Sequence, residues 1–348
     1  MTHMNCALVI GQGRSGTNWL LDLLDLSHRT HCRNEPDELV GSPFSTLSSP
    51  TIQQPYSETF SKNWEQAIAT AAMQMGYRDR IAANPKAHLR SQVSRLGGAY
   101  LLRGQRRRQI ASIVSPSLAG EQWTAPDWMI DRQQLEQAYP IFKLNQAPGW
   151  AAWVLNHRPR SRVIHIMRHP GGFLNSWRNR YVTAQATDQI RQANSDRLKK
   201  IAAASPHWAR RMGDIDAMCI DESELWYWCY ANEVVYRAGQ GQSNYHLIIY
   251  EDLVRSPADQ MRQVYSTCGL PWTSAIESRI TSSAAASASI AMAWKHQIAP
   301  AQRRLVDSIL AKSAMANHWP PDINRTASAA HVSEIPATGC LRALIPVQ

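Results

Sequence analysis

A glycine-rich turn between an apolar run and a helix-like stretch is the feature that most constrains this chain of 348 residues. Residues 8–20 read LVIGQGRSGTNWL, in which an apolar run typical of a buried strand leads into a turn and then into a second apolar segment. Glycines let the backbone fold back tightly, so several N–H groups and the helix N-terminus can converge on one anion. The segment predicts a phosphate-binding loop between a first strand and a first helix.

This loop differs from the loop of ATP-binding proteins. The pattern G-x-x-x-x-G-K-[ST] places a lysine before a hydroxyl residue that binds magnesium. Here Gly16 is followed directly by Thr17, and the nearest cation is Arg14. We therefore expect a loop that holds a phosphate without the metal-dependent machinery of a kinase.

A second segment is also expected to form a strand, a turn and a helix in that order. Residues 162–181 read RVIHIMRHPGGFLNSWRNRY, with Arg168 at the predicted strand end and Ser176 eight residues later on the helix. A guanidinium can bond two phosphate oxygens at once, and a hydroxyl on the next helix can add a third contact. This segment predicts a second phosphate site.

Together the two segments resemble the sulfotransferases that use 3′-phosphoadenosine-5′-phosphosulfate (PAPS). The 5′-phosphosulfate loop of that family is matched by residues 14–20, and its R-[DNH]-P motif with a following serine is matched by residues 168–170 and Ser176. Residues 250–253, reading YEDL, and Trp294 give further matches. The resemblance spans roughly residues 6–320, although residues 45–135 have no clear counterpart.

The resemblance implies two sets of residues that bind PAPS and its product, 3′,5′-adenosine bisphosphate (PAP). Those expected around the 5′-phosphosulfate are Gly13, Arg14, Ser15, Gly16, Thr17, Asn18 and Trp19. Those expected at the 3′-phosphate are Arg168 and Ser176. Many family members close this site with an R-K-G loop, which residues 279–296 lack, and Lys295 is the substitute candidate.

The resemblance also implies the catalytic groups. Glu35, followed by Pro36, fits a family pattern in which a glutamate after the second strand is the base, whereas the alternative is a surface acidic turn. Related enzymes that act on phenols use a histidine where this chain has Asn145, which cannot take up a proton at neutral pH. Lys143 could contact the sulfuryl oxygens or be an ordinary strand-end lysine, and Arg14 would stabilise the leaving group. This chemistry requires no metal.

Apolar runs and helix-like segments alternate along the chain, which predicts an α/β fold: a P-loop-like parallel sheet flanked by helices on both faces. The expected strands are 6–10, 29–33, 140–145, 162–167 and 244–250. The expected helices are 17–27, 148–157, 171–183, 222–238 and 257–268. We expect one domain over 1–325, with helical insertions at 45–135 and 184–220 covering the acceptor site and a weakly ordered tail at 326–348. Within the first insertion, 61–75 and 86–102 read as helices.

The amino-acid composition restricts which ligands the protein can bind and where in the cell it can be located. The net charge of +10 favours anionic ligands without choosing among them. Six cysteines without metal-ligand spacing, no leader and no run of about 20 apolar residues favour a cytoplasmic protein with reduced thiols and no transmembrane segment. Thirteen tryptophans, among them Trp123, Trp128, Trp150 and Trp153, could stack on sugars or pack in the core.

The sequence thus favours a PAPS-dependent sulfotransferase acting on the hydroxyl of a carbohydrate or another small alcohol. One alternative is a P-loop phosphotransferase, which the missing G-K-[ST] lysine disfavours. The other is a nucleic-acid-binding protein that uses the basic cluster at 103–108, which would leave both phosphate motifs unexplained. We therefore expect no nucleic-acid partner, and the sequence predicts neither the acceptor's identity nor the oligomeric state.

Overall fold

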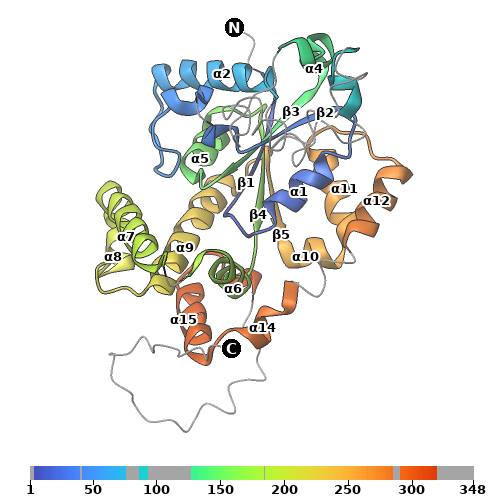
Figure 1. The fold of residues 1–348 in the computed structure, drawn as a ribbon. Helices are drawn as coiled ribbons and strands as arrows, with labels where there is room; N and C mark the ends of the chain where they lie inside the picture. The colour runs from blue at the N-terminus through green and yellow to red at the C-terminus, as the bar shows by residue number, and fades with distance from the viewer. Residues whose placement is uncertain are drawn as a thin grey trace.

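A parallel sheet forms the centre of the computed structural model, which describes residues 4–39, 41–75, 86–92, 127–183, 185–284 and 291–319 (Figure 1). Within these residues the strand order is β2-β3-β1-β4-β5, and every neighbouring pair is parallel. The strands are β1 Ala7–Gly11, β2 Thr30–Asn34, β3 Tyr139–Asn145, β4 Arg162–Met167 and β5 Tyr245–Ile249. All five lie within one residue of the strands expected from the sequence, and the α/β prediction is confirmed.

Helices cover both faces of the sheet because successive residues of each buried strand point to opposite sides. Leu8 and Ile10 of β1 pack in one core with α2, α5 and α9, whereas Ala7 and Val9 pack in the other with α1, α11 and α12. Figure 1 shows α5 and α9 on one side of the strands and α1, α11 and α12 on the other. These helices are α1 Thr17–Leu24, α2 Glu58–Ala72, α5 Pro148–His157, α9 Ile220–Gly239, α11 Pro257–Thr267 and α12 Ser274–Ala284.

A third core lies around the remaining long helices, where α9 packs against α6, α7 and α15. The second insertion is helical as expected, since α7 and α8 fill most of it. The bounds are α6 Pro170–Tyr181, α7 Thr187–Ala204, α8 Pro206–Met212 and α15 Pro300–Ala311. Shorter helices are α4 Arg132–Gln137, α10 Tyr250–Arg255 and α14 Trp294–Gln297.

The first insertion is described only in part. Its first expected helix is α2, but the second begins with a short 3₁₀ turn, Lys86–Leu89, and residues 93–102 lie outside the described residues. The basic cluster at 103–108, Trp123, Cys340 and the expected tail at 326–348 also lie outside them. Trp150 and Trp153 are buried in the core around α5, so core packing accounts for both.

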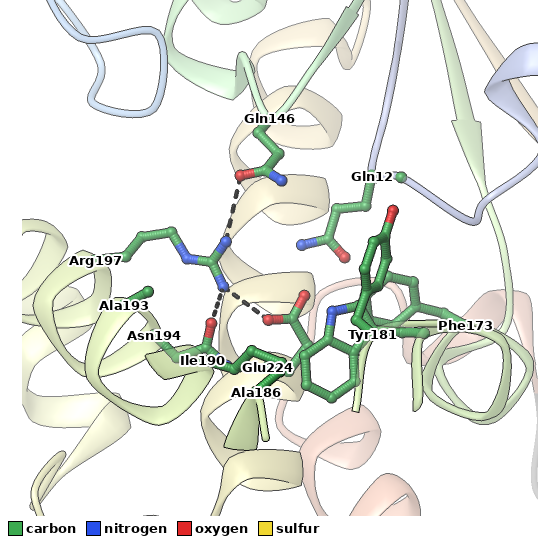
Figure 2. A pocket seen from close by; sticks show the side chains of 12 residues that line it. Gln12, Gln146, Phe173, Tyr181, Ala186, Ile190, Ala193, Asn194, Arg197 and Glu224 are labelled. Atoms are coloured by element: carbon green, nitrogen blue, oxygen red, sulfur yellow. Dashed lines mark hydrogen bonds and ion pairs between the residues drawn. The ribbon is translucent and has the colours of Figure 1, made fainter. Parts of the chain in front are cut away.

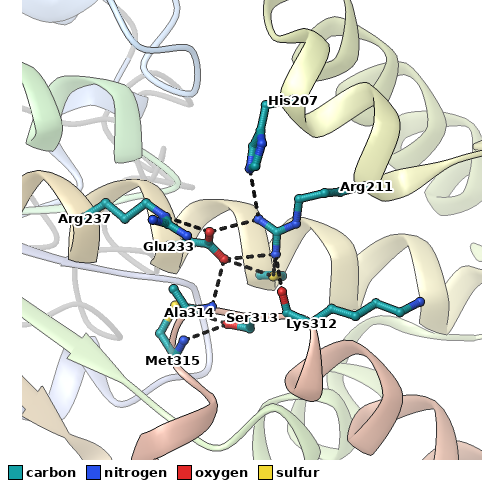
Figure 3. Close-up of polar contacts among 9 residues, drawn as sticks. His207, Arg211, Glu233, Arg237, Lys312, Ser313, Ala314 and Met315 are labelled. Carbon is teal, nitrogen blue, oxygen red and sulfur yellow. Dashed lines mark hydrogen bonds and ion pairs between the residues drawn. The ribbon is translucent and has the colours of Figure 1, made fainter.

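A buried carboxylate connects α8, α9 and the chain after α15 (Figure 3). Glu233 of α9 is fully buried and accepts hydrogen bonds from Arg211 at 2.9 and 3.1 Å and from Arg237 at 2.8 Å. It also accepts the backbone N–H of Ala314 at 3.1 Å. A buried carboxylate is costly unless it is paired, so these contacts hold the three segments in one arrangement. That arrangement fixes α9, whose N-terminal half contributes to the pocket described below.

Candidate active site

The two predicted phosphate motifs meet at the carboxyl edge of the sheet. β1 and β4 are parallel neighbours, so the loop after β1 and the turn after β4 leave the sheet side by side. Arg14 Nε donates a hydrogen bond to Ser176 Oγ at 3.1 Å, across 162 positions of sequence. Arg168 Nη1 donates to the backbone oxygen of Arg14 at 3.2 Å. The structure therefore brings the 5′-motif and the 3′-motif into direct contact.

The loop after β1 has the tight conformation that its glycines predict. Gly16 caps the N-terminus of α1 with φ of 95°, and Arg14 also has a left-handed φ, 76°, which is uncommon for a residue with a side chain. Arg14 is exposed, and it forms no ion pair with any described residue. An uncompensated guanidinium on a strained loop beside a helix N-terminus is suited to an anion.

Tyr250, from the third sequence match, packs beneath both motifs. The guanidinium of Arg168 lies 4.7 Å from the Tyr250 ring centroid. A Cβ atom on Gly16 would lie 2.5 Å from Tyr250 Cδ2, closer than van der Waals contact allows. The tyrosine thus orients Arg168 and restricts position 16 to glycine. We did not assign it a site role from the sequence, although the YEDL match marked its position.

The turn after Arg168 is held in place by contacts of His169 with Trp294 and Glu251. The ring of His169 stacks on Trp294 at a centroid distance of 4.2 Å, and its backbone N–H donates to Glu251 Oε1 at 3.1 Å. Burial, and then the charge of Lys295, lower the pKa of His169 to about 3, so the ring is neutral and structural. Lys295 is half-buried on α14 and directly follows Trp294, whose ring stacks on His169, the residue after Arg168.

Glu35 lies in a hydrogen-bonded network that joins β2, β3 and α1. The fully buried Lys143 Nζ donates to Glu35 Oε1 at 2.5 Å and to Asn34 Oδ1 at 2.9 Å. Asn145 Nδ2 donates to the same Glu35 oxygen, while Asn145 Oδ1 accepts a hydrogen bond from Thr17 Oγ1 at 3.3 Å. Glu35 therefore pairs directly with Lys143, and Asn145 connects it to Thr17, so three predicted site residues belong to one network.

This network decides between alternatives left open by the sequence. The Glu35 side chain is only 15% exposed and pairs with Lys143, so Glu35 is not part of a surface acidic turn. Glu38, by contrast, is exposed. Asp37 does not face solvent fully: the residue is half-buried, its Oδ1 atom is shielded from solvent, and this burial raises the pKa of its carboxyl to about 7. Lys143 is a buried partner of Glu35 rather than an ordinary strand-end lysine. Direct contact between Lys143 and sulfuryl oxygens stays a prediction.

The remaining predicted loop residues differ in exposure. Ser15 is fully buried, Asn18 is exposed, and Trp19 packs edge-to-face on Tyr250 at 6.0 Å. The Trp19 ring nitrogen donates to Ser283 of α12 at 3.3 Å. In the structure Trp19 therefore anchors the start of α1 against neighbouring elements.

A pocket of about 450 Å³ adjoins the phosphate loop and was not predicted from the sequence (Figure 2). Gln12 and Gly13 of the loop line it together with Gln146, the residue after Asn145. Side chains of α6, α7 and α9 form the rest: Phe173, Trp177, Tyr181, Ile190, Asn194, Arg197 and Glu224 among them. The only sequence signal was the aromatic spacing i, i+4, i+8 at 173, 177 and 181, which places three rings on one helix face.

A parallel sheet with a glycine-rich loop after its first strand defines a P-loop-like α/β protein. The model of the sulfotransferase family matches residues 7–274, and the chain belongs to this family. No curated protein matches the chain.

Solved sulfotransferase structures are similar to it at low identity. The sulfotransferase domain of the Synechococcus PCC 7002 olefin synthase is 15% identical, with a TM-score of 0.41 over 88% of this chain and 96% of that one. Mouse sulfotransferase SULT7A1, solved with PAP, is 12% identical, with a TM-score of 0.36 over 93% and 88%. STF9 from Mycobacterium avium is 14% identical, with a TM-score of 0.36 over 82% and 69%. In the described part of the chain, no helix combines the length and apolarity needed to cross a bilayer.

Proposed function

We propose that this sulfotransferase uses PAPS as its donor and transfers the sulfuryl group to the hydroxyl of a carbohydrate or another small alcohol. The observation that carries the proposal is the contact between Arg14 and Ser176, since it joins two motifs that each suit one phosphate of PAPS. Family membership over residues 7–274 supports the reaction class.

The residues of the site fit a nucleotide with phosphates at both ends of its ribose. Arg14 has no acidic partner among the described residues, and Arg168 is held between the Tyr250 ring and the Arg14 carbonyl. PAPS would supply the sulfuryl group and leave as PAP. Arg14 would neutralise negative charge on the leaving phosphate, while Arg168 and Ser176 would bind the 3′-phosphate. Lys295 remains the proposed additional cation on that side.

Glu35 is the proposed base. Its carboxylate is held by Lys143 and Asn145, and Asn145 in turn contacts Thr17 at the start of α1, so the carboxylate is fixed relative to the phosphate loop. A carboxylate positioned in this way can accept the acceptor's hydroxyl proton while the oxygen bonds to sulfur. Lys143 and Asn145 are positioning residues in this scheme, because each donates a hydrogen bond to the Glu35 carboxylate.

Cofactor preference tests the proposal. Calorimetry without magnesium should show that PAP binds more tightly than ADP or AMP, because only PAP carries both 3′- and 5′-phosphates. Incubation with labelled PAPS and a panel of alcohols should then show transfer. Equal affinity for magnesium-ATP would contradict the proposal and favour the phosphotransferase alternative. We also propose that residues 1–325 form a single domain and that the protein is cytoplasmic.

A further inference from the structure

We propose that the pocket between α6, α7 and α9 binds the acceptor, and that it selects an uncharged hydroxylated molecule with a flat apolar portion, such as an aryl glycoside. This inference rests on the proposed function and adds the place and the chemical class of the acceptor. The volume of about 450 Å³ is within the range of small-molecule sites.

The position of the pocket relates it to the proposed chemistry. Gln12 and Gly13 belong to the phosphate loop, and Gln146 directly follows Asn145, which contacts Glu35. α6 carries Ser176, which contacts Arg14, and the neighbouring Trp177, which lines the pocket. A molecule in the pocket therefore lies against the same loop and the same helix that form the proposed nucleotide site.

One wall of the pocket is apolar. Phe173, Trp177 and Tyr181 succeed one another at four-residue intervals along α6, and Ile190 of α7 lines the same space. Aromatic side chains contribute large apolar contact areas and favour flat partners. This wall suits an aryl group or the apolar face of a ring.

The other wall is polar but carries no net charge. Arg197 is the only basic residue and Glu224 the only acidic residue among the described residues that line the pocket. They pair at 2.7 Å, and the Arg197 guanidinium also contacts Gln146 at 3.3 Å (Figure 2). The same guanidinium stacks on the Tyr227 ring at 3.5 Å. Because its cation is already neutralised, this wall offers little to an anionic acceptor and can hydrogen-bond a neutral one.

Gln12 indicates that the polar end of the ligand carries hydroxyl groups. Only 3% of the residue is exposed, yet neither its amide nitrogen nor its amide oxygen has a hydrogen-bond partner among the residues that the structure describes. Figure 2 shows the amide directed into the space between Gln146 and Glu224. A hydroxyl both donates and accepts, so hydroxyls can satisfy both ends of the amide. The separate cavity behind Gln12 measures about 10 Å³ and has room for one water at most.

Three matched probes test the inference on the full-length protein. These are 4-nitrophenyl β-D-glucoside, which is neutral and aromatic; methyl β-D-glucoside, which lacks the aryl group; and 4-nitrophenyl β-D-glucuronide, which carries a carboxylate. Each is titrated by calorimetry with and without saturating PAP, and each is offered as acceptor with PAPS. The aryl glucoside should bind about tenfold or more tightly than either of the others. Equal or stronger binding of the glucuronide or of the methyl glucoside would overturn the inference.

Variants locate the binding. Tyr181→Ala removes a half-exposed ring at the end of α6 and should weaken the aryl glucoside about fivefold while leaving PAP affinity unchanged. Glu224→Gln leaves Arg197 without its counter-ion and should shift the preference towards the glucuronide. Asp216→Asn is the matched control, because Asp216 pairs with Lys199 on the exposed face of α7. This substitution should leave the affinities for the probes and for PAP unchanged. Unchanged affinity in folded Tyr181→Ala would place the ligand elsewhere.

The nucleotide readout separates the two proposals. If PAP binds but the probes do not discriminate as expected, the acceptor inference fails and the proposed function stands. If PAP does not bind but the probes do, the proposed function fails and the selectivity of the pocket stands. Gln12→Leu should weaken all three sugar probes, and unchanged affinities would show that a water, not the ligand, satisfies the Gln12 amide.

Discussion

The pairing of Glu35 with Lys143 allows the chemical and the structural roles of the glutamate to be separated. Glu35→Gln keeps the shape of the side chain but removes the charge, so it should lower single-turnover transfer by ~10²–10⁴, the usual contribution of a general base. It also leaves Lys143, whose side chain is fully buried, without its counter-ion. Breaking a buried pair from one side typically costs about 3–5 kcal/mol of the free energy of unfolding. Asn34, which accepts a hydrogen bond from the same ammonium at 2.9 Å, should place the loss at the lower end of that range.

A second substitution distinguishes the two effects. The double variant Glu35→Gln with Lys143→Met replaces both charges, so the free energy of unfolding in urea should return towards that of the parent, whereas transfer should remain at the level of Glu35→Gln. Glu38→Gln, an exposed change in the same turn, is the control and should affect neither quantity. Recovery of transfer in the double variant would refute the reasoning, because Glu35 would then be only the counter-ion of Lys143. PAP affinity, measured on the same samples, should stay constant.

Three further changes follow from the site. Arg168→Ala should weaken PAP binding in calorimetry by roughly 2–4 kcal/mol, whereas Arg180→Ala, exposed on the same helix, should not, and equal affinities would remove Arg168 from the site. Because burial raises the pKa of Asp37 to about 7 from 3.8, the folded protein retains a proton that the unfolded chain releases, so the stability contribution of this group falls as pH rises from about 4 to about 7. Asp37→Asn should remove that part of the pH dependence in urea unfolding at several pH values, and an unchanged slope would contradict it. Gly16→Ala should lower the unfolding free energy by more than about 1 kcal/mol, since the added methyl group meets an aromatic ring at a left-handed φ. Gly13→Ala meets nothing within 4 Å and should be mild by comparison in the same unfolding assay.

The strands and the phosphate loop could be predicted because their causes are local. Short apolar runs bounded by turn residues specify buried parallel strands, and the Gly-Gln-Gly-Arg-Ser-Gly turn specifies its own backbone conformation. α5 was predicted with its observed bounds, Pro148–His157, since proline favours the first turn of a helix. α1 was predicted to residue 27 but ends at Leu24, because the chain turns at Asp25 to reach β2.

The acceptor pocket could not be predicted because its polar wall depends on contacts between distant residues. Arg197 and Glu224 lie on α7 and α9, and each reads in sequence as an ordinary surface charge of an amphipathic helix. Gln12 lies between two glycines of the loop, and nothing in the local sequence indicates that its amide is buried. The same holds for Asp37, which in sequence is one of three acidic residues in a turn but in the structure is half-buried, with its Oδ1 atom shielded from solvent.

One helix connects the two halves of the proposed reaction. On α6, Ser176 contacts the cation of the phosphate loop, while Phe173, Trp177 and Tyr181 line the pocket. Consecutive helical residues point about 100° apart, so adjacent positions can serve different ligands on one rigid element. The helix is itself fixed at both ends: Trp294 packs on Gly171 so closely that a Cβ there would lie 2.3 Å from its ring, and Arg178 pairs with Asp221 of α9. Changes at the aromatic positions should therefore alter which acceptor binds without displacing Ser176, and this makes the pocket face of α6 the place where acceptor specificity can vary independently of nucleotide binding.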